Sequence, residues 1–137
     1  MLDFSNSKIL IVGDVMLDKY YFGKVDRISP EAPVPIVNIQ KEESRLGGAS
    51  NVANNIVSLG GHSLLCGVIG HDLFGKEIER ISRHKNIDTF LLKTSSPTIT
   101  KARIIGGKQQ IVRVDYEDKS ELNADNKKLF RDTISGI

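Results

Sequence analysis

The chain has 137 residues, 39% of them hydrophobic and 26% charged, and its 19 basic against 17 acidic side chains give a formal net charge of +2. A chain of this size and composition forms one globular domain or part of one, and the even charge balance gives no support for a nucleic-acid or membrane partner. The single cysteine, Cys66, excludes an intrachain disulfide and a cysteine-based metal cluster. Its apolar surroundings predict a buried hydrophobic side chain.

The N-terminal stretch 1-MLDFSNSK-8 carries neither a basic leader nor a long apolar run, so it does not predict a signal peptide. Nowhere does the sequence approach the roughly 20 consecutive apolar residues of a membrane-spanning helix. We therefore expect a cytoplasmic protein.

The first elements in chain order are an apolar strand and a proline-rich excursion. The run 8-KILIVGD-14 is typical of an inner strand of a parallel sheet that ends at a polar residue. The segment 23–43 contains prolines at a density that excludes a helix and a central strand, although 34-VPIVNIQ-40 can still form an edge strand. These prolines are Pro30, Pro33 and Pro35.

The segment 47-GGASNVANNIVSLGG-61 changes to a helical period. Ser50 or Asn51 can cap the start of this helix, and Gly60 with Gly61 supplies a left-handed stop. The predicted apolar stripe consists of Val52, Ala53, Ile56, Val57 and Leu59.

Strand and helix patterns then alternate. The run 63-SLLCGVI-69 predicts a buried strand, 73–84 a helix with Phe74, Ile78 and Ile81 on its apolar face, and 89-TFLL-92 a short strand. Crossover helices between apolar strands predict an α/β fold with a mostly parallel sheet and flanking helices.

The segment 98-TITKARIIGGKQQIVRVD-115 predicts a hairpin that turns at Gly106-Gly107 and carries many polar side chains, so one of its faces meets solvent or a ligand. A last helix begins near 124, with Leu129, Phe130 and Ile134 on its apolar side. So few inner strands leave a sheet edge open and the last helix uncovered. We therefore expect the chain to be an incomplete domain.

The string 70-GHDLFGKE-77 matches a Walker A phosphate loop except at its last position, where Glu77 replaces the expected Ser or Thr. Its position between a strand and a helix fits a phosphate loop. However, Glu77 would set a carboxylate beside phosphate charge, and the interior lacks the extra glycines that let the backbone approach a phosphate. A plain strand-to-helix turn is the favoured interpretation.

The motifs taken together resemble the N-terminal half of the ribokinase, or PfkB-type, sugar kinase family. Its first signature joins a Gly-Gly-x-x-x-Asn helix start to a later glycine pair and a Gly-x-Asp-x-x-Gly turn. The matching residues are Gly47, Gly48, Asn51, Gly60, Gly61, Gly70, Asp72 and Gly75. The resemblance implies a ribokinase-like, Rossmann-like fold over 1–137 with a small β lid made from segments about 23–43 and 98–115, and it identifies the near-Walker string as part of this signature.

Within the family, 27-RISPEAPVP-35 and 109-QQIVRVD-115 resemble the heptose 7-phosphate kinases, which are often fused to a heptose 1-phosphate adenylyltransferase. This implies a complete enzyme that transfers the γ-phosphate of ATP, with Mg²⁺, to the anomeric hydroxyl of D-glycero-D-manno-heptose 7-phosphate. The product leads to ADP-heptose for bacterial lipopolysaccharide.

The resemblance implies that Asp18, Gly47, Gly48 and Asn51 contact the sugar. A carboxylate can accept from two neighbouring hydroxyls, glycines let the backbone approach the ring, and an asparagine offers a donor and an acceptor. Each residue also has a plain structural interpretation: Asp18 as a solvated loop residue, Gly47-Gly48 as a turn and Asn51 as a helix cap.

A substrate that already bears a phosphate needs cationic partners, and arginine binds phosphate through two parallel hydrogen bonds. Arg113 is the first candidate on the predicted lid, followed by Lys101 and Arg103. The alternative is a solvated strand face, where exposed cations are common. The resemblance also implies that the lid mediates a homodimer.

The Gly-Ala-Gly-Asp motif that supplies the family's catalytic base does not occur in this sequence. We therefore expect the chain alone to hold no catalytic residue, to bind neither ATP nor Mg²⁺ and to be inactive as a kinase. A non-catalytic module for sugar-phosphate binding or dimerisation, and a P-loop NTPase fragment, are the other functions left open.

Overall fold

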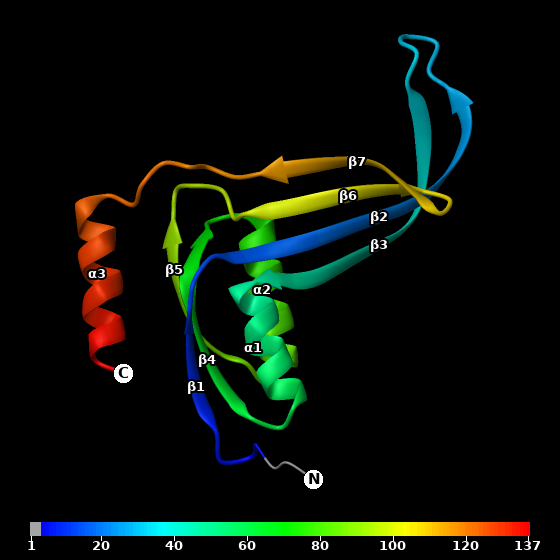
Figure 1. Cartoon of the computed structure of the whole chain (residues 1–137). Helices are drawn as coiled ribbons and strands as arrows, with labels where there is room; N and C mark the ends of the chain where they lie inside the picture. The colour runs from blue at the N-terminus through cyan, green and yellow to red at the C-terminus, as the bar shows by residue number, and fades with distance from the viewer. Residues whose placement is uncertain (1–3) are drawn as a thin grey trace.

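A computed structural model describes residues 4–137 as a three-stranded sheet with helices, from which a four-stranded sheet projects (Figure 1). Residues 1–3, part of the stretch that predicts no signal peptide, lie outside the described residues. The elements in chain order are β1 (Lys8–Val12), β2 (Val15–Ile28), β3 (Pro35–Gly48), α1 (Ala49–Ser58), β4 (His62–Gly70), α2 (Leu73–His84), β5 (Asp88–Thr94), β6 (Thr100–Gly106), β7 (Gln109–Tyr116) and α3 (Ala124–Ser135).

The three-stranded sheet is parallel throughout, with the order β1-β4-β5, and this confirms the predicted α/β class. Helices α1 and α2 cover one of its faces, while α3 lies on the other side (Figure 1). The side chains between the sheet, α1, α2 and the base of the second sheet form the hydrophobic core. Its buried members are Val15, Leu17, Leu46, Ala53, Leu65, Ile69, Ile78, Ile81 and Ile87.

Strand β1 is not an inner strand in this chain, contrary to the prediction from its apolar run. It forms one edge of the sheet, and three of its five side chains, Ile9, Leu10 and Val12, are 42–50% exposed. The inner strand is β4, whose Leu65 and Cys66 are fully buried. Burial raises the pKa of the Cys66 thiol, in keeping with the predicted hydrophobic role.

Helix α2 has the predicted bounds of 73–84, because its start and its apolar face are both fixed locally. Asp72 accepts a hydrogen bond from the Gly75 N–H at 2.8 Å as the N-cap, and Ile78 and Ile81 are buried at helical spacing. None of the helices within residues 4–137 combines the length and apolar character needed to cross a bilayer.

Helix α1 starts differently from the prediction. Neither Ser50 nor Asn51 caps it. The N-cap is Gly48, at φ 54° and ψ −133°, and among residues 4–137 no side chain caps the first turn. The predicted apolar stripe is only partly buried: Ala53 is covered, but Val52 and Leu59 are 49% and 65% exposed. The predicted stop is confirmed, with Gly60 at φ 90°.

The four-stranded sheet, here called the lid sheet, has the order β3-β2-β6-β7. Strand β2 pairs antiparallel with β3 and parallel with β6, and β6 pairs antiparallel with β7. Strands β2 and β3 have 14 residues each and extend beyond the segment 23–43, so Asp18 lies within a strand rather than in a loop. Beyond β6 and β7, the ends of β2 and β3 continue as a bent two-stranded ribbon (Figure 1).

The hairpin expected over 98–115 is confirmed as β6 and β7, and its turn lies one residue further along the chain than predicted. Gly106 pairs with Gln109, so the turn consists of Gly107 and Lys108, with Gly107 at φ 63°. A positive φ at the first central residue is what a type II′ hairpin turn requires. All eight residues of β7 are exposed, so this strand contributes surface rather than core.

Candidate functional site

The lid sheet has one covered face and one face free of helices. Val15 and Leu17 point from β2 into the core and are at most 1% exposed. Because side chains alternate along a strand, Met16, Asp18 and Tyr20 point to the other face. In-register neighbours share a face, which places Gly47, the partner of Met16, and Lys101, the partner of Asp18, on this side. We call it the open lid face.

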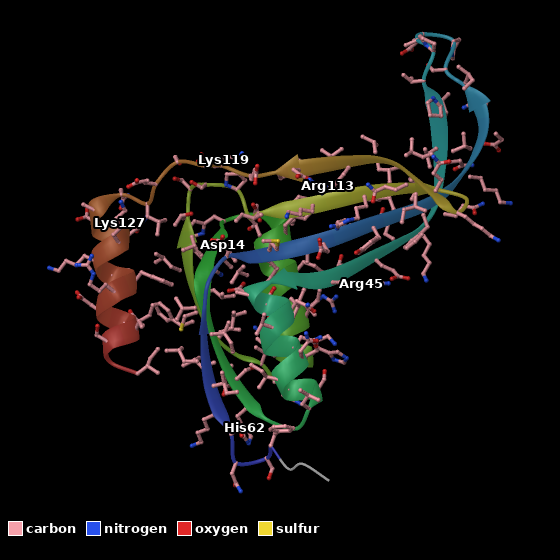
Figure 2. All side chains as sticks on the ribbon, viewed as in Figure 1. Asp14, Arg45, His62, Arg113, Lys119 and Lys127 are labelled. Atoms are coloured by element: carbon pink, nitrogen blue, oxygen red, sulfur yellow. The ribbon has the colours of Figure 1, made fainter. Side chains whose placement is uncertain are left out.

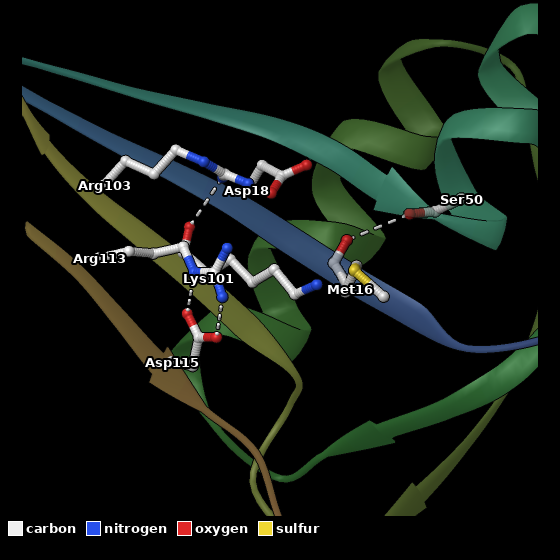
Figure 3. Close-up of polar contacts among 7 residues, drawn as sticks. All are labelled: Met16, Asp18, Ser50, Lys101, Arg103, Arg113 and Asp115. Carbon is white, nitrogen blue, oxygen red and sulfur yellow. Dashed lines mark hydrogen bonds and ion pairs between the residues drawn. The ribbon is translucent and has the colours of Figure 1, made fainter. Parts of the chain in front are cut away.

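Asp18 makes two different contacts on the open lid face, and Figure 3 shows it beside the first partner, Arg103. Its Oδ1 accepts a 2.6 Å charge-assisted hydrogen bond from Arg103, and both side chains are only 22% exposed. Its Oδ2 lies beside the backbone of Gly47, so close that a Cβ atom on Gly47 would be 2.6 Å from this oxygen. The fold therefore joins two of the predicted sugar residues, and a side chain at position 47 would displace the Asp18 carboxylate.

Arg103 occupies the centre of the open lid face. Its guanidinium lies 5.2 Å from the ring centroid of Tyr20, and Arg45 lies over the same ring at 4.8 Å. The hydrogen bond to Asp18 raises the pKa of Arg103. Tyr20 is not among the predicted site residues, because its place on this face follows from strand β2, which the sequence pattern does not reveal.

Lys101 also lies on this face, half-buried and in register with Asp18. Within residues 4–137 its ammonium makes no ion pair. A lysine without an acidic partner, beside a carboxylate already bound to an arginine, leaves positive charge available for an anionic ligand.

Arg113 differs from these two cations. On β7 it forms a two-pronged ion pair with Asp115, with nitrogen–oxygen distances of 2.8 and 2.9 Å, and half of its side chain is exposed. Figure 2 shows it on the outer strand opposite to the one that carries Arg45. Because its guanidinium fork is already bound to a carboxylate, Arg113 is less available for phosphate than Arg103 or Lys101. Its predicted role as the first phosphate ligand stays a prediction.

Gly48 and its neighbours connect the lid sheet to α1. The Ala49 N–H donates to the Asp14 carbonyl at 2.9 Å, and the Ser50 hydroxyl lies 2.6 Å from the Gly47 carbonyl and 3.2 Å from that of Met16. Ser50 thus joins β2 and β3 to α1, a role that its predicted use as a helix cap did not include. Asn51, one residue on, is exposed, and its predicted contact with the sugar stays a prediction.

The near-Walker string is joined to Thr98 by hydrogen bonds, and we call the group of Gly70, Asp72, Gly75 and Thr98 the bracket. Asp72 accepts hydrogen bonds from the Gly75 N–H, the Thr98 N–H and the Thr98 hydroxyl at 2.7–2.8 Å, and the Gly70 N–H donates to the same hydroxyl. Burial by itself raises the pKa of Asp72, but these hydrogen bonds together lower it. The Gly70 and Gly75 N–H groups that a phosphate loop would offer are bound within the protein.

A nucleotide-bound magnesium ion needs oxygen ligands. Within residues 4–137 no group of three or more His, Cys, Asp or Glu side chains is arranged to hold a metal ion. The donor set within residues 4–137 therefore does not fit such an ion.

Two curated proteins are similar in sequence over most of the chain. A D-beta-D-heptose 7-phosphate kinase of Bordetella bronchiseptica is 50% identical over 118 residues, which are 85% of this chain. A bifunctional protein HldE of Helicobacter pylori is 52% identical over 127 residues, or 91% of this chain. The matched regions are 38% and 28% of these relatives, so the chain spans well under half of their lengths.

Solved structures share the fold at low sequence identity. Phosphofructokinase-2 of Escherichia coli in complex with fructose-6-phosphate aligns with 100% of this chain and 42% of its own, with a TM-score of 0.68 and 17% identity. A carbohydrate kinase of Agrobacterium tumefaciens aligns with 90% of this chain and 37% of its own, with a TM-score of 0.64 and 17% identity. The family description "pfkB family carbohydrate kinase" matches residues 6–134, and the chain therefore belongs to the pfkB family of carbohydrate kinases.

Proposed function

We propose that this chain is the sugar-binding part of a kinase that transfers the γ-phosphate of ATP to the anomeric hydroxyl of D-glycero-D-manno-heptose 7-phosphate. The observation that carries the proposal is the 50% identity with the Bordetella kinase. The geometry of the open lid face supports it, because Asp18 and Gly47 lie beside two cations, Lys101 and Arg103, that suit a substrate with hydroxyls and a phosphate.

The proposed contacts divide into two groups. Asp18, Gly47, Gly48 and Asn51 contact the sugar ring and its hydroxyls. The phosphate is bound by the three cations of β6 and β7, which are Lys101, Arg103 and Arg113. ATP and Mg²⁺ are bound by residues other than those of this chain, which supplies no catalytic base. The complete enzyme acts in the cytoplasm and supplies a precursor of ADP-heptose.

Calorimetric titration tests this division. We expect the chain to bind heptose 7-phosphate, to show no heat with ATP and to give no turnover when both are present. Asp18→Asn lowers the affinity for heptose 7-phosphate about tenfold or more, because an NH2 group replaces one of the two carboxylate oxygens that accept hydrogen bonds from sugar hydroxyls. Asp26→Asn, on the same strand but in the projecting ribbon, is the matched control. Equal affinities of the two variants would contradict the proposed sugar contact.

We also propose that the lid forms a homodimer through its projecting ribbon. A two-stranded ribbon is at best marginally stable by itself, and this one exposes large apolar side chains. They are Val25 at 41%, Ile28 at 61%, Val34 at 50% and Ile39 at 39% exposure. Apolar surface of this kind on an unsupported ribbon favours burial against a second copy.

Sedimentation velocity tests the dimer. We expect Ile28→Glu to convert a dimer into a monomer, because a carboxylate cannot be buried in an apolar interface without a partner. The control is Leu73→Glu on α2, where the native side chain is 78% exposed and lies outside the lid sheet. A dimer that survives Ile28→Glu, or dissociates equally in both variants, argues against an interface at the ribbon.

A further inference from the structure

We propose that Arg103 is a positioning residue as well as a phosphate ligand: it holds the Asp18 carboxylate for the sugar and thereby couples the hydroxyl and phosphate halves of the site. This inference rests on the proposed function. Two observations within residues 4–137 carry it: Asp18 binds Arg103 through only one of its oxygens, and Arg103 binds the protein through only one of its nitrogens.

The Asp18 carboxylate is held through one of its two oxygens. Its Oδ1 is bound by Arg103 at 2.6 Å, whereas its Oδ2 lies against the glycine backbone of Gly47. One oxygen is thus fixed inside the protein, and the other is directed along the surface that the absence of a side chain on Gly47 keeps free. A carboxylate anchored through one oxygen presents the second in a single orientation to a ligand hydroxyl.

The Arg103 guanidinium uses only some of its donors within the protein. Among residues 4–137 its guanidinium donates only through one terminal nitrogen, to Asp18 and, at 3.4 Å, to the Lys101 carbonyl. The other N–H groups of its planar fork have no protein acceptor, and Lys101 adds an unpaired ammonium on the same face. An arginine has donors in several directions and can bind a carboxylate with one edge and a phosphate with another.

Two other arginines lie near this site, and each is paired with an acidic residue other than Asp18. Arg45 is the in-register partner of Asp18 on β3 and packs on the same Tyr20 ring, yet it donates to Glu43 at 2.7 Å. Arg113 binds Asp115 through Nε and one terminal nitrogen, which form one edge of its guanidinium, and makes no bond to Asp18. Of the three, only Arg103 donates to Asp18, whereas the other two are paired with acidic residues on their own strands.

The test compares two ligands, heptose 7-phosphate and unphosphorylated heptose, by chemical-shift titration of the 137-residue chain. We expect Arg103→Gln to weaken the phosphorylated sugar about a hundredfold and the unphosphorylated sugar about tenfold, although the latter has no phosphate for the guanidinium to bind. Arg103→Lys, which keeps the charge, recovers part of the affinity for the phosphorylated sugar. Arg45→Gln, the matched control, changes neither affinity by more than about twofold.

A double-mutant cycle isolates the coupling. In an Asp18→Asn background, Arg103→Gln should no longer weaken the unphosphorylated sugar, because the carboxylate that it positions is gone. An unchanged affinity of Arg103→Gln for unphosphorylated heptose, or a full tenfold loss in the Asp18→Asn background, would overturn the inference.

If the unsubstituted chain binds neither sugar, the proposed function fails, and the same cycle measured by urea unfolding then decides the inference. Non-additive effects of the two substitutions on the unfolding equilibrium, by roughly fivefold or more, support the coupling. Additive effects overturn it.

Discussion

Asp72→Ala is expected to lower the free energy of unfolding of this chain by about 3 kcal/mol. The Asp72 carboxylate accepts three hydrogen bonds, and its loss leaves the Thr98 N–H and hydroxyl without that acceptor in a buried position. An unsatisfied buried donor costs about 1–3 kcal/mol, and removal of the α2 N-cap adds about 1 kcal/mol. Urea denaturation followed by circular dichroism measures the change.

The same bracket makes stability depend on pH. The hydrogen bonds hold the pKa of Asp72 below its ordinary value in the folded chain. The carboxylate therefore stabilises the fold fully above its unfolded pKa of about 3.9, and this stabilisation is lost as the pH falls through the lower folded value. We expect Asp72→Asn, which keeps one acceptor oxygen, to cost about 1–2 kcal/mol at pH 7. An unfolding free energy of the Asn variant that falls between pH 5 and 3 as steeply as the native one would show that Asp72 is not the titrating group.

The bracket also has a consequence for the site, because Thr98 directly precedes the strand that carries Lys101 and Arg103. The Leu17 N–H donates to the Ile99 carbonyl at 2.9 Å, so the start of β6 is fixed to both α2 and β2. The Gly-x-Asp-x-x-Gly part of the family signature is therefore a support for the lid rather than a ligand-binding loop.

The elements that could be predicted from the sequence are those determined by neighbouring residues. Helix α2 is such a case, since its cap at Asp72 and its stripe at Ile78 and Ile81 lie within one short segment. Strand β2 was missed because both of its faces carry large side chains. Val15 and Leu17 point into the core, but Met16 and Tyr20 on the other face are also bulky, so no alternation of apolar and polar residues is visible.

The sequence supplies candidate residues for the site but not their arrangement. The family resemblance names both Asp18 and Gly47 as sugar contacts, and the structure places the Asp18 carboxylate beside Gly47. The pairing of Arg103 with Asp18 joins residues 85 positions apart, which no local pattern indicates. In contrast, the neutralisation of Arg113 by Asp115 was readable, because residues two apart on an exposed strand share a face.

Gly48→Ala is expected to have the largest effect at the base of the lid. Gly48 has φ 54° and ψ −133°, a conformation open almost only to glycine, and a Cβ atom there would lie 2.4 Å from the Asp14 carbonyl oxygen. That oxygen accepts the Ala49 N–H, so relief of the clash breaks the hydrogen bond that joins α1 to the start of β2. We expect a loss of about 3 kcal/mol in the free energy of unfolding and a fall of more than about tenfold in affinity for heptose 7-phosphate.

Gly60→Ala separates the two causes of this loss. Gly60 also has a positive φ, 90°, but a Cβ atom at this position meets nothing within 4 Å. The Gly60→Ala variant therefore measures backbone strain alone. We expect it to lose about 1 kcal/mol in the free energy of unfolding and to keep its affinity for heptose 7-phosphate. The difference between the two variants then measures the close packing of Gly48 against Asp14. If Gly48→Ala costs no more stability than Gly60→Ala and binds the sugar phosphate normally, the contact between Gly48 and Asp14 does not hold the lid in its binding position.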